Sequence, residues 1–313
     1  MDEEAYGESV TAIATLEDGS FILLQALLTN AGVGDEKGAC RILYVPKNKR
    51  GINVVDRDGD DWTYQKSNNT LKVSTCTIQG GATKTVFKAK ADGVKAHLTL
   101  HAKRHVVKPP SSSVRIEDDQ IFTSEVLTPW ADATLDIRGK GLKSLKLKGK
   151  GYLDHGRSNT LMPKVAKGWF KFRGIVGETP IILEVRTAPN GSKKGWIWHA
   201  LEKGKWGKPK KLTTTELKSW TLNLSRKAKL KGEDETTTEP MPQLTLKWSK
   251  GGGSLEIKAT KPLYRYEPAK AYGLMGRLAK SWVGDPITRT YEATAKWPQG
   301  EAKGLIEYIL IRD

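Results

Sequence analysis

The residues whose types could do chemistry gather in one strand-like segment, residues 149–159, which reads Gly-Lys-Gly-Tyr-Leu-Asp-His-Gly-Arg-Ser-Asn. In an extended chain, Tyr152 and Asp154 share one face, and Leu153 and His155 share the other. Burial raises the pKa of a carboxyl toward neutrality, and a phenol donates or accepts a hydrogen bond. A Tyr152–Asp154 pair facing a dry cavity could therefore move a proton on a bound ligand. The alternative is a strand end where Asp154 caps a turn and His155 packs between domains.

Three tryptophans are candidate walls for a ligand cavity. Trp130 precedes the segment 149–159, and its ring face could stabilise a nearby cation. Trp196 and Trp198 share one face of a predicted strand, where the two rings could line a second cavity or fill it. The alternative for each ring is an ordinary core position.

The sequence offers no metal or cofactor signature. His97, His101 and His105 are four residues apart, but residues 94–101 alternate as a strand, in which successive histidines lie roughly 13 Å apart and cannot share one ion. No GxSxG, Walker or HExxH motif is present, and the glycines at 149 and 151 lack the helix that follows a dinucleotide-binding turn. We expect neither a metal nor a cofactor.

Strands must position these side chains, because alternation of apolar and polar residues runs through most of the chain. The predicted strands include residues 9–16, 21–29, 71–78, 83–89, 94–102, 142–155, 169–176, 181–187, 195–202, 243–249, 254–259, 288–296 and 304–312. Asp-Gly, Asn-Gly and Gly-Gly pairs between them are typical of hairpin turns. Helical spacing of apolar residues predicts a helix only over residues 269–282, and residues 108–113 and 227–242 are expected to be loops.

The chain of 313 residues is about twice as long as one domain, and its halves resemble each other. Lys150–His155 aligns with Lys303–Tyr308, and a second match at a similar offset joins the openings of the halves. Chance similarity between amphipathic strands is the alternative explanation. We expect two domains, residues 1–165 and 166–313, each an antiparallel barrel of some eight to ten strands with room for one small ligand. The predicted fold class is all-β, with at most one or two short helices.

The net charge of +17 indicates anionic partners in general. Most of the excess lies in residues 166–313, which carry 28 Lys and Arg against 15 Asp and Glu. This half could dock transiently on anionic membrane surfaces. The basic stretch 203–211, with Trp206 inside it, also suits phosphates or lipid headgroups, with a solvated hairpin turn as the alternative. No nucleic-acid motif accompanies it, so nucleic acid is an unfavoured partner.

The compartment is predicted from three features of the sequence. The first residues are acidic where a secretory signal is basic, and no apolar run reaches the roughly 20 residues of a membrane-spanning helix. Cys40 and Cys76 lack CxxC or zinc-ligand spacing and are too few for a disulfide framework, so we expect both to be reduced. Together these features predict a cytoplasmic protein, with peripheral membrane association as an option.

The chain resembles the lipocalin-like family of carotenoid 1,2-hydratases (hydroxyneurosporene synthases), fungal survival-factor proteins and fungal Diels-Alderases. Residues 149–155 resemble the family's central GxGYxDHNWG motif, residues 9–28 its first hairpin, and the segments 262–266, 284–286 and 304–308 its closing strands. The resemblance implies tandem lipocalin-like barrels and a large apolar ligand such as a polyene, terpenoid or sphingolipid.

The resemblance also implies roles for single residues. Tyr152 and Asp154 match the proposed acid and base of the hydratase-like members, and Trp130 the upstream aromatic. After His155 the chain departs from the motif and reads Gly-Arg-Ser-Asn, which places the fixed charge of Arg157 nearby.

Two functions follow from these observations. The first is binding or carrying a hydrophobic small molecule, an isoprenoid, polyene or lipid, with His155, Arg157, Trp196 and Trp198 as ligand contacts. The second is a cofactor-independent hydratase or cyclase, in which Asp154 protonates an apolar alkene beside Tyr152 and Trp130 stabilises the cation. Nucleic-acid binding through the basic half is a third, less favoured function.

Overall fold

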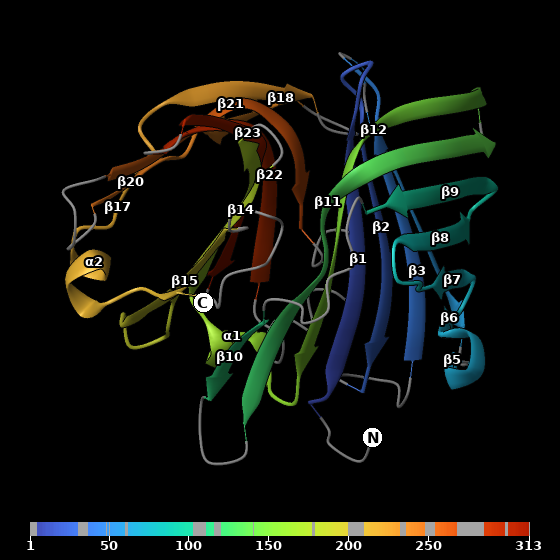
Figure 1. Cartoon of the computed structure of the whole chain (residues 1–313), viewed down its shortest axis with the longest axis horizontal. Coiled ribbons are helices and arrows are strands. Elements are labelled where there is room, and N and C mark those ends of the chain that lie inside the picture. The colour runs from blue at the N-terminus through green and yellow to red at the C-terminus, as the bar shows by residue number, and fades with distance from the viewer. Residues whose placement is uncertain are drawn as a thin grey trace. The chain divides into compact units, whose positions relative to one another are not determined.

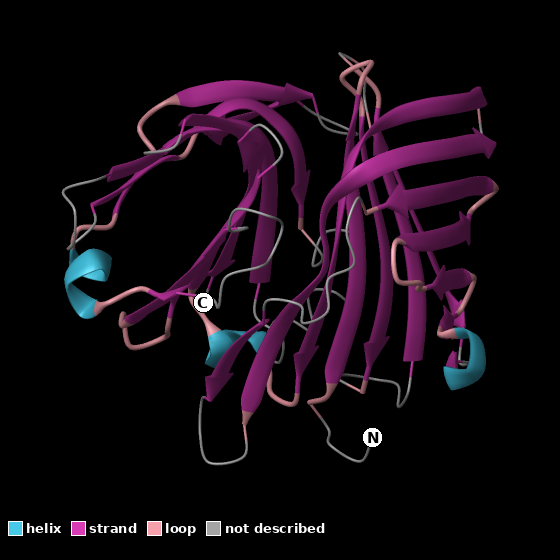
Figure 2. Ribbon diagram, viewed as in Figure 1, coloured by secondary structure: helices cyan, strands magenta, loops and turns pink. Residues whose placement is uncertain are grey.

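The computed structural model describes residues 5–30, 37–47, 49, 51–59, 62–102, 111–115, 120–139, 141–176, 179–199, 210–231, 236–247, 254–267, 285–297 and 300–312. Strands dominate these residues (Figure 2), so the predicted all-β class is confirmed. The chain divides into two compact units, Met1–Leu161 and Met162–Asp313. The helix expected over residues 269–282 lies outside the described residues. No described helix has the length and apolar character needed to cross a membrane.

The first unit is a single antiparallel sheet with one short 3-10 helix, η1 (Lys66–Asn68). The strand order is β4-β3-β2-β1-β12-β11-β9-β8-β7-β6-β5, with β10 paired to β11. The strands are β1 (Gly7–Leu16), β2 (Phe21–Thr29), β3 (Lys37–Val45), β4 (Ile52–Gly59), β5 (Trp62–Gln65), β6 (Thr70–Val73), β7 (Cys76–Gln79), β8 (Lys84–Ala91), β9 (Val94–His101), β10 (Ser111–Arg115), β11 (Ile121–Gly139) and β12 (Leu142–Ser158).

In the second unit, as in the first, the last strand pairs with the first: β23 pairs with β13, as β12 pairs with β1. Figure 1 shows the strands of both units. The main sheet of the second unit has the order β16-β15-β14-β13-β23-β22-β21-β20-β17, and β18 and β19 form a separate hairpin. The elements are α1 (Met162–Val165), β13 (Gly168–Val176), β14 (Thr179–Thr187), β15 (Lys193–His199), β16 (Lys210–Lys211), α2 (Thr214–Lys218), β17 (Thr221–Asn223), β18 (Lys227–Lys231), β19 (Thr236–Pro240), β20 (Gln243–Lys247), β21 (Ser254–Tyr266), β22 (Asp285–Trp297) and β23 (Gly300–Arg312).

The prediction of a loop over residues 227–242 is wrong, because this segment contains the β18–β19 hairpin. The segment alternates as Lys-Ala-Lys-Leu-Lys on one side, and its other side is a run of three threonines. Alternation and β-branched residues both favour strands, and the charged and proline residues around them concealed the pattern.

The hydrophobic core of the first unit lies on one face of its curled sheet. In β1 the core residues are Val10, Ala12, Ala14 and Leu16, which recur at every second position as a half-buried strand requires. The same alternation places Leu153 of β12 in this core. The core therefore fixes which side chains of each strand point to the interior of the half-barrel.

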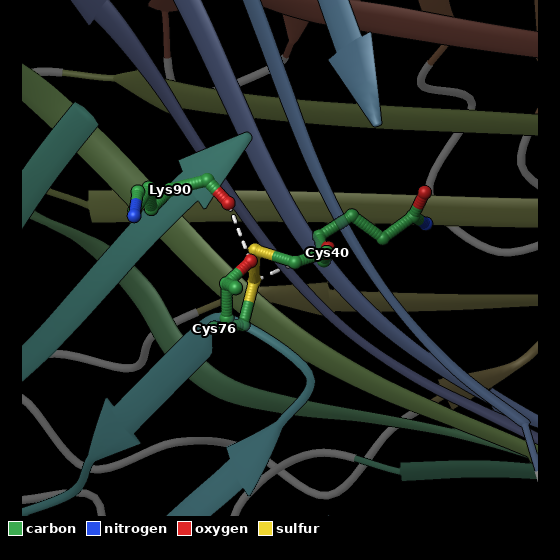
Figure 3. Close-up of a disulfide and its surroundings, with 5 residues drawn as sticks. Cys40, Cys76 and Lys90 are labelled. Carbon is green, nitrogen blue, oxygen red and sulfur yellow. Dashed lines mark hydrogen bonds between the residues drawn. A yellow bond between two sulfur atoms is a disulfide. The ribbon is translucent and has the colours of Figure 1, made fainter. Parts of the chain in front are cut away.

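A disulfide joins Cys40 to Cys76 within this core (Figure 3), so the prediction of two reduced cysteines is wrong. Cys40 lies in β3 and Cys76 begins β7, strands from opposite sides of the sheet order. The curl of the sheet brings β3 against β7 and β8, and the two Cα atoms lie 5.3 Å apart. Spacing in the sequence carries no sign of this approach. The cysteine argument for a reducing compartment no longer applies.

Candidate functional site

A cavity of about 550 Å³ lies on the core side of the first unit's sheet. This volume is within the range of pockets that hold one small molecule. Its walls are mainly apolar and include Val10, Leu28, Leu71, Ile78, Leu100 and Leu153. Trp62 and Tyr64 of β5 also line it and are the two exposed large hydrophobic side chains among the described residues, which places them at its opening.

Two ionisable side chains, Glu8 and His155, line the same cavity. Glu8 is in β1 and His155 is in β12, the first and last strands of the sheet, which pair directly. Since Val10 is opposite His155 in this ladder, Glu8 and His155 lie diagonally across it on one face. The His155 Nε2 atom is 2.5 Å from the Glu8 Oε1 atom. About one quarter of each side chain is exposed, so a ligand can reach both.

Neighbouring side chains hold Glu8 as a carboxylate. The Tyr6 hydroxyl donates a hydrogen bond to the second carboxylate oxygen of Glu8. The Arg157 guanidinium lies 5.4 Å from the centre of the Tyr6 ring. The hydrogen bond from His155 is the main cause that lowers the pKa of Glu8. The Tyr6 hydrogen bond and the charges of His155 and Arg157 act in the same direction, and burial opposes them.

A carboxylate paired with an imidazole can perform two tasks at the polar end of an apolar cavity. It fixes the orientation and tautomer of the ring, and it stabilises the imidazolium when the ring takes up a proton. No described residue hydrogen-bonds the other ring nitrogen, Nδ1 of His155. Since His155 lines the cavity, its ring is within reach of a bound ligand.

The Tyr152–Asp154 pair does not line this cavity. Both side chains are buried, but they belong to the face of β12 opposite Leu153 and His155. Thr11 of β1 and Val126 of β11 flank Asp154 in the two ladders. Leu153 packs into the core, and a strand cannot send adjacent side chains to the same face, so Tyr152 and Asp154 point away from this cavity. Their predicted catalytic role stays a prediction.

Trp130 lies close to Tyr152 in the ladder, at an irregularity of β11. Thr128 pairs with Leu153 and Ala131 with Gly151, so Pro129 and Trp130 together oppose Tyr152 in a bulge. Trp130 has a φ of 48°, and its buried Nε1 has no hydrogen-bond partner among the described residues. The fold thus brings Trp130, Tyr152 and Asp154 to one part of the sheet, and Trp130 does not line the described cavity.

Trp196 and Trp198 of β15 are buried, but neither ring belongs to the core of the second unit. Ile197 between them does, so the two rings lie on the other face of the strand. The expectation that they line or fill the barrel interior is corrected on this ground. Their face carries a buried Glu184–Arg186 ion pair. The Arg186 guanidinium is 5.7 Å from the Trp196 ring centre, and burial lowers the pKa of Arg186.

The interior of the second unit contains a second buried ion-pair group. Glu239 accepts hydrogen bonds from Arg265 and Arg289, each at 2.7 Å. These hydrogen bonds lower the pKa of Glu239 in spite of its burial, which acts in the opposite direction. The buried carboxylate is satisfied from two strands, as a structural ion pair requires.

No three His, Cys, Asp or Glu side chains within the described ranges lie close enough to hold a metal ion. His97 and His101 are exposed on the outer face of β9, and His105 lies outside the described residues. Most of the basic stretch 203–211 also lies outside them.

Sequence reasoning found His155 and Arg157 but missed Glu8 and Tyr6. Glu8 is 147 positions from His155 and comes just before an ordinary alternating segment. The only available signal was an ionisable side chain near one end of each strand, Glu8 at the beginning of β1 and His155 near the end of β12. The pairing of first and last strands joins them, and that pairing is a property of the fold.

The fold is lipocalin-like, the class to which several solved structures with the same architecture belong. A structure of an AttH-type protein from Nitrosomonas europaea matches with a TM-score of 0.65 and 13% identity, over 98% of this chain and 92% of that one. CghA matches with a TM-score of 0.64 and 12% identity, over 99% and 88%. CghA with Sch210972 gives a TM-score of 0.63 and 10% identity, over 99% and 89%.

Kievitone hydratase from Nectria haematococca matches with a TM-score of 0.60 and 12% identity, over 98% of this chain and 89% of that one. At these identities the likeness concerns the fold. No protein-family model matches the chain, and a search of curated proteins found no match.

Proposed function

We propose that the first unit binds one hydrophobic small molecule, an isoprenoid, polyene or lipid, in its cavity. The observation that carries this proposal is an apolar cavity of about 550 Å³ with the Glu8–His155 pair on its wall. Burial of the apolar part of the ligand provides most of the binding free energy, at about 25 cal/mol per Å². The ion pair contacts a polar group of the ligand and so selects its orientation.

The lipocalin-like fold supports this proposal. One of the matching structures is CghA with Sch210972, so a protein of this architecture has been crystallised together with Sch210972. The cavity combines apolar walls with one ionisable pair. This combination suits a long apolar ligand that carries a hydroxyl, carbonyl or carboxyl group.

A second candidate function is acid–base catalysis on the bound molecule, as in a hydratase or cyclase. The Glu8–His155 pair favours it, because an imidazolium beside a carboxylate can donate a proton and take it back. The architecture shared with kievitone hydratase is compatible with it. The roles assigned to Asp154, Tyr152 and Trp130 stay predictions, since these side chains do not line the cavity.

Titration with a fluorescent polyene fatty acid tests the binding function. Thr85 of β8 lines the cavity, and the adjacent Val86 points to the opposite face, so the two positions form a matched pair. Thr85→Phe should fill part of the cavity and weaken binding at least about tenfold, which corresponds to about 1.4 kcal/mol. Val86→Phe should bind as the wild type does. Absence of saturable binding, or equal binding by Thr85→Phe, would refute the proposal.

The role of the ion pair is tested with two ligands of equal length. Glu8→Gln and His155→Ala should weaken binding of the polyene acid and leave binding of the corresponding hydrocarbon unchanged. Any substrate conversion by the wild type should be lost in His155→Ala. Equal effects on both ligands would show that the pair only supports the cavity wall.

A further inference from the structure

The outer face of four neighbouring strands, β8, β9, β11 and β12, carries a dense array of basic side chains. These positions alternate with core residues and point away from the core. Eight are lysine or arginine and two are aspartate: Lys84, Lys88, Lys90, Lys95, Arg138, Lys146, Lys148 and Lys150, with Asp132 and Asp136. We call this set the basic face. It lies in the first unit, although most of the chain's excess charge is in the other half.

The ladders show that the basic face is continuous. Lys84, His101, Asp132 and Lys150 occupy one row across the four strands. In a parallel row, Lys88 and Lys146 flank His97 and Asp136, and further rows contain the remaining basic residues. Asp132 is neutralised by an ion pair with Lys150. Like charges at this spacing repel each other, so an anionic partner would bind favourably here.

His97 lies among the side chains of this array. Burial is the main cause that lowers its pKa, the charges of Lys88 and Lys84 lower it further, and only Asp136 acts in the opposite direction. The excess of positive charge on the basic face itself follows from its composition, eight lysine and arginine side chains against two aspartates.

The basic face adjoins the cavity opening. Thr83 and Ala102 line the cavity, and each is the sequence neighbour of a residue in the first row, Lys84 and His101. The exposed rings of Trp62 and Tyr64 stand at the same opening, with 37% and 53% of their surfaces accessible. Tryptophan and tyrosine with an apolar body and a polar tip are typical of the interface between lipid headgroups and hydrocarbon.

We propose that the basic face docks the first unit on an anionic phospholipid bilayer, with Trp62 and Tyr64 at headgroup level beside the cavity opening. Lysine and arginine attract acidic headgroups, at about 1 kcal/mol for each residue near the surface. Docking in this orientation gives an apolar ligand a short path between bilayer and cavity, and that consequence rests on the proposed function. The docking itself requires no ligand.

Nucleic acid is a less favoured occupant of this face. Single strands bind through bases stacked on aromatic rings, and the described outward positions of these four strands contain no exposed tryptophan, tyrosine or phenylalanine, since Tyr152 is buried. The exposed rings are at the cavity opening, where bases would compete with an apolar ligand.

The test is co-sedimentation of the full chain with vesicles of phosphatidylcholine alone and of phosphatidylcholine with about one third phosphatidylserine. The wild type should bind only the anionic vesicles, and high salt should release it. The variant Lys88→Glu, Lys146→Glu, Lys148→Glu should bind about a hundredfold less tightly or worse. A control with the same change in net charge replaces the exposed Lys193, Lys229 and Lys258 of the second unit by glutamate and should bind like the wild type.

Three results would overturn the proposal: no binding of the wild type to anionic vesicles, equal loss in the basic-face variant and the control, or binding to single-stranded RNA but not to vesicles. If the glutamate variant fails to fold, the corresponding glutamine variant gives the same comparison with a smaller loss. Failure of the proposed function is distinguishable, because Thr85→Phe should still bind vesicles, and the basic-face variant should still bind the polyene acid in solution.

Discussion

The disulfide between Cys40 and Cys76 should provide a large part of the first unit's stability. The two cysteines are 36 positions apart, and a covalent loop of this length restricts the unfolded chain by about 4 kcal/mol in the chain-entropy description. Typical domains are stable by about 5–15 kcal/mol, so losing this bond should bring the first unit close to its stability limit. The variant Cys40→Ala, Cys76→Ala removes the bond.

The arrangement of the sheet explains why this bond matters here. The edge strands β4 and β5 do not pair with each other in the described ladders, so hydrogen bonds do not close the curled sheet. Side-chain packing in the core and the disulfide between β3 and β7 hold its two sides together. Removing the bond should therefore loosen the cavity as well, since strands β5 to β8 contribute to its wall.

Urea unfolding followed by peptide-resolved hydrogen exchange measures the two units separately. At a slope of about 2 kcal/mol per molar urea, the expected loss lowers the midpoint of the first unit by about 2 M. Peptides of the second unit, which lacks cysteine, should keep their midpoint and serve as the internal control. Reduced wild-type protein should behave like the double variant, which separates the bond from the packing of the sulfur atoms. An unchanged midpoint of the first unit would refute the reasoning.

Two further changes probe the first unit. The lowered pKa of Glu8 means that its ionised form adds stability above its ordinary value of 4.5, and this is lost as the pH falls through the folded-state pKa. Glu8→Gln should therefore cost roughly 0.5–1 kcal/mol at neutral pH and little in acid, by urea titrations across pH; a constant difference would contradict this. A Cβ at Gly149 would lie 2.1 Å from the Thr15 carbonyl oxygen, so Gly149→Ala should lower the free energy of unfolding by about 1–3 kcal/mol. Gly156→Ala in the same strand, where the nearest atom is a serine hydroxyl at 3.3 Å, is its control, and equal losses would argue against a steric cause.

The sequence was sufficient to predict the all-β class of the fold. Alternation along segments such as residues 94–101 and 304–312 identified strands, and glycine pairs marked the hairpins between them. These are local properties, because the face on which a side chain lies is set by its parity within the strand. The same parity rule, applied to the sequence alone, separated Tyr152 and Asp154 from Leu153 and His155.

The local sequence pattern could not predict which of the two faces of a strand points to the core. That choice depends on the neighbours that each strand obtains in the sheet, and the core residues of β1 and β11 placed Leu153 and His155 inward. The cavity therefore has His155, a predicted ligand contact, on its wall, and Asp154, the predicted acid, does not line it. Similarly, Ile197 took the core position in β15 and left Trp196 and Trp198 on the other face.

The sequence by itself determined the strands, the turns and the alternation of side chains, because these follow from interactions between residues close along the chain. Only the tertiary structure decided the partners across long separations: Glu8 with His155, Cys40 with Cys76, and the rows of lysines that form the basic face. Each depends on a sheet that pairs its last strand with its first and curls around one core. Such contacts form from the packing of the whole unit, and no short stretch of sequence contains the information that specifies them.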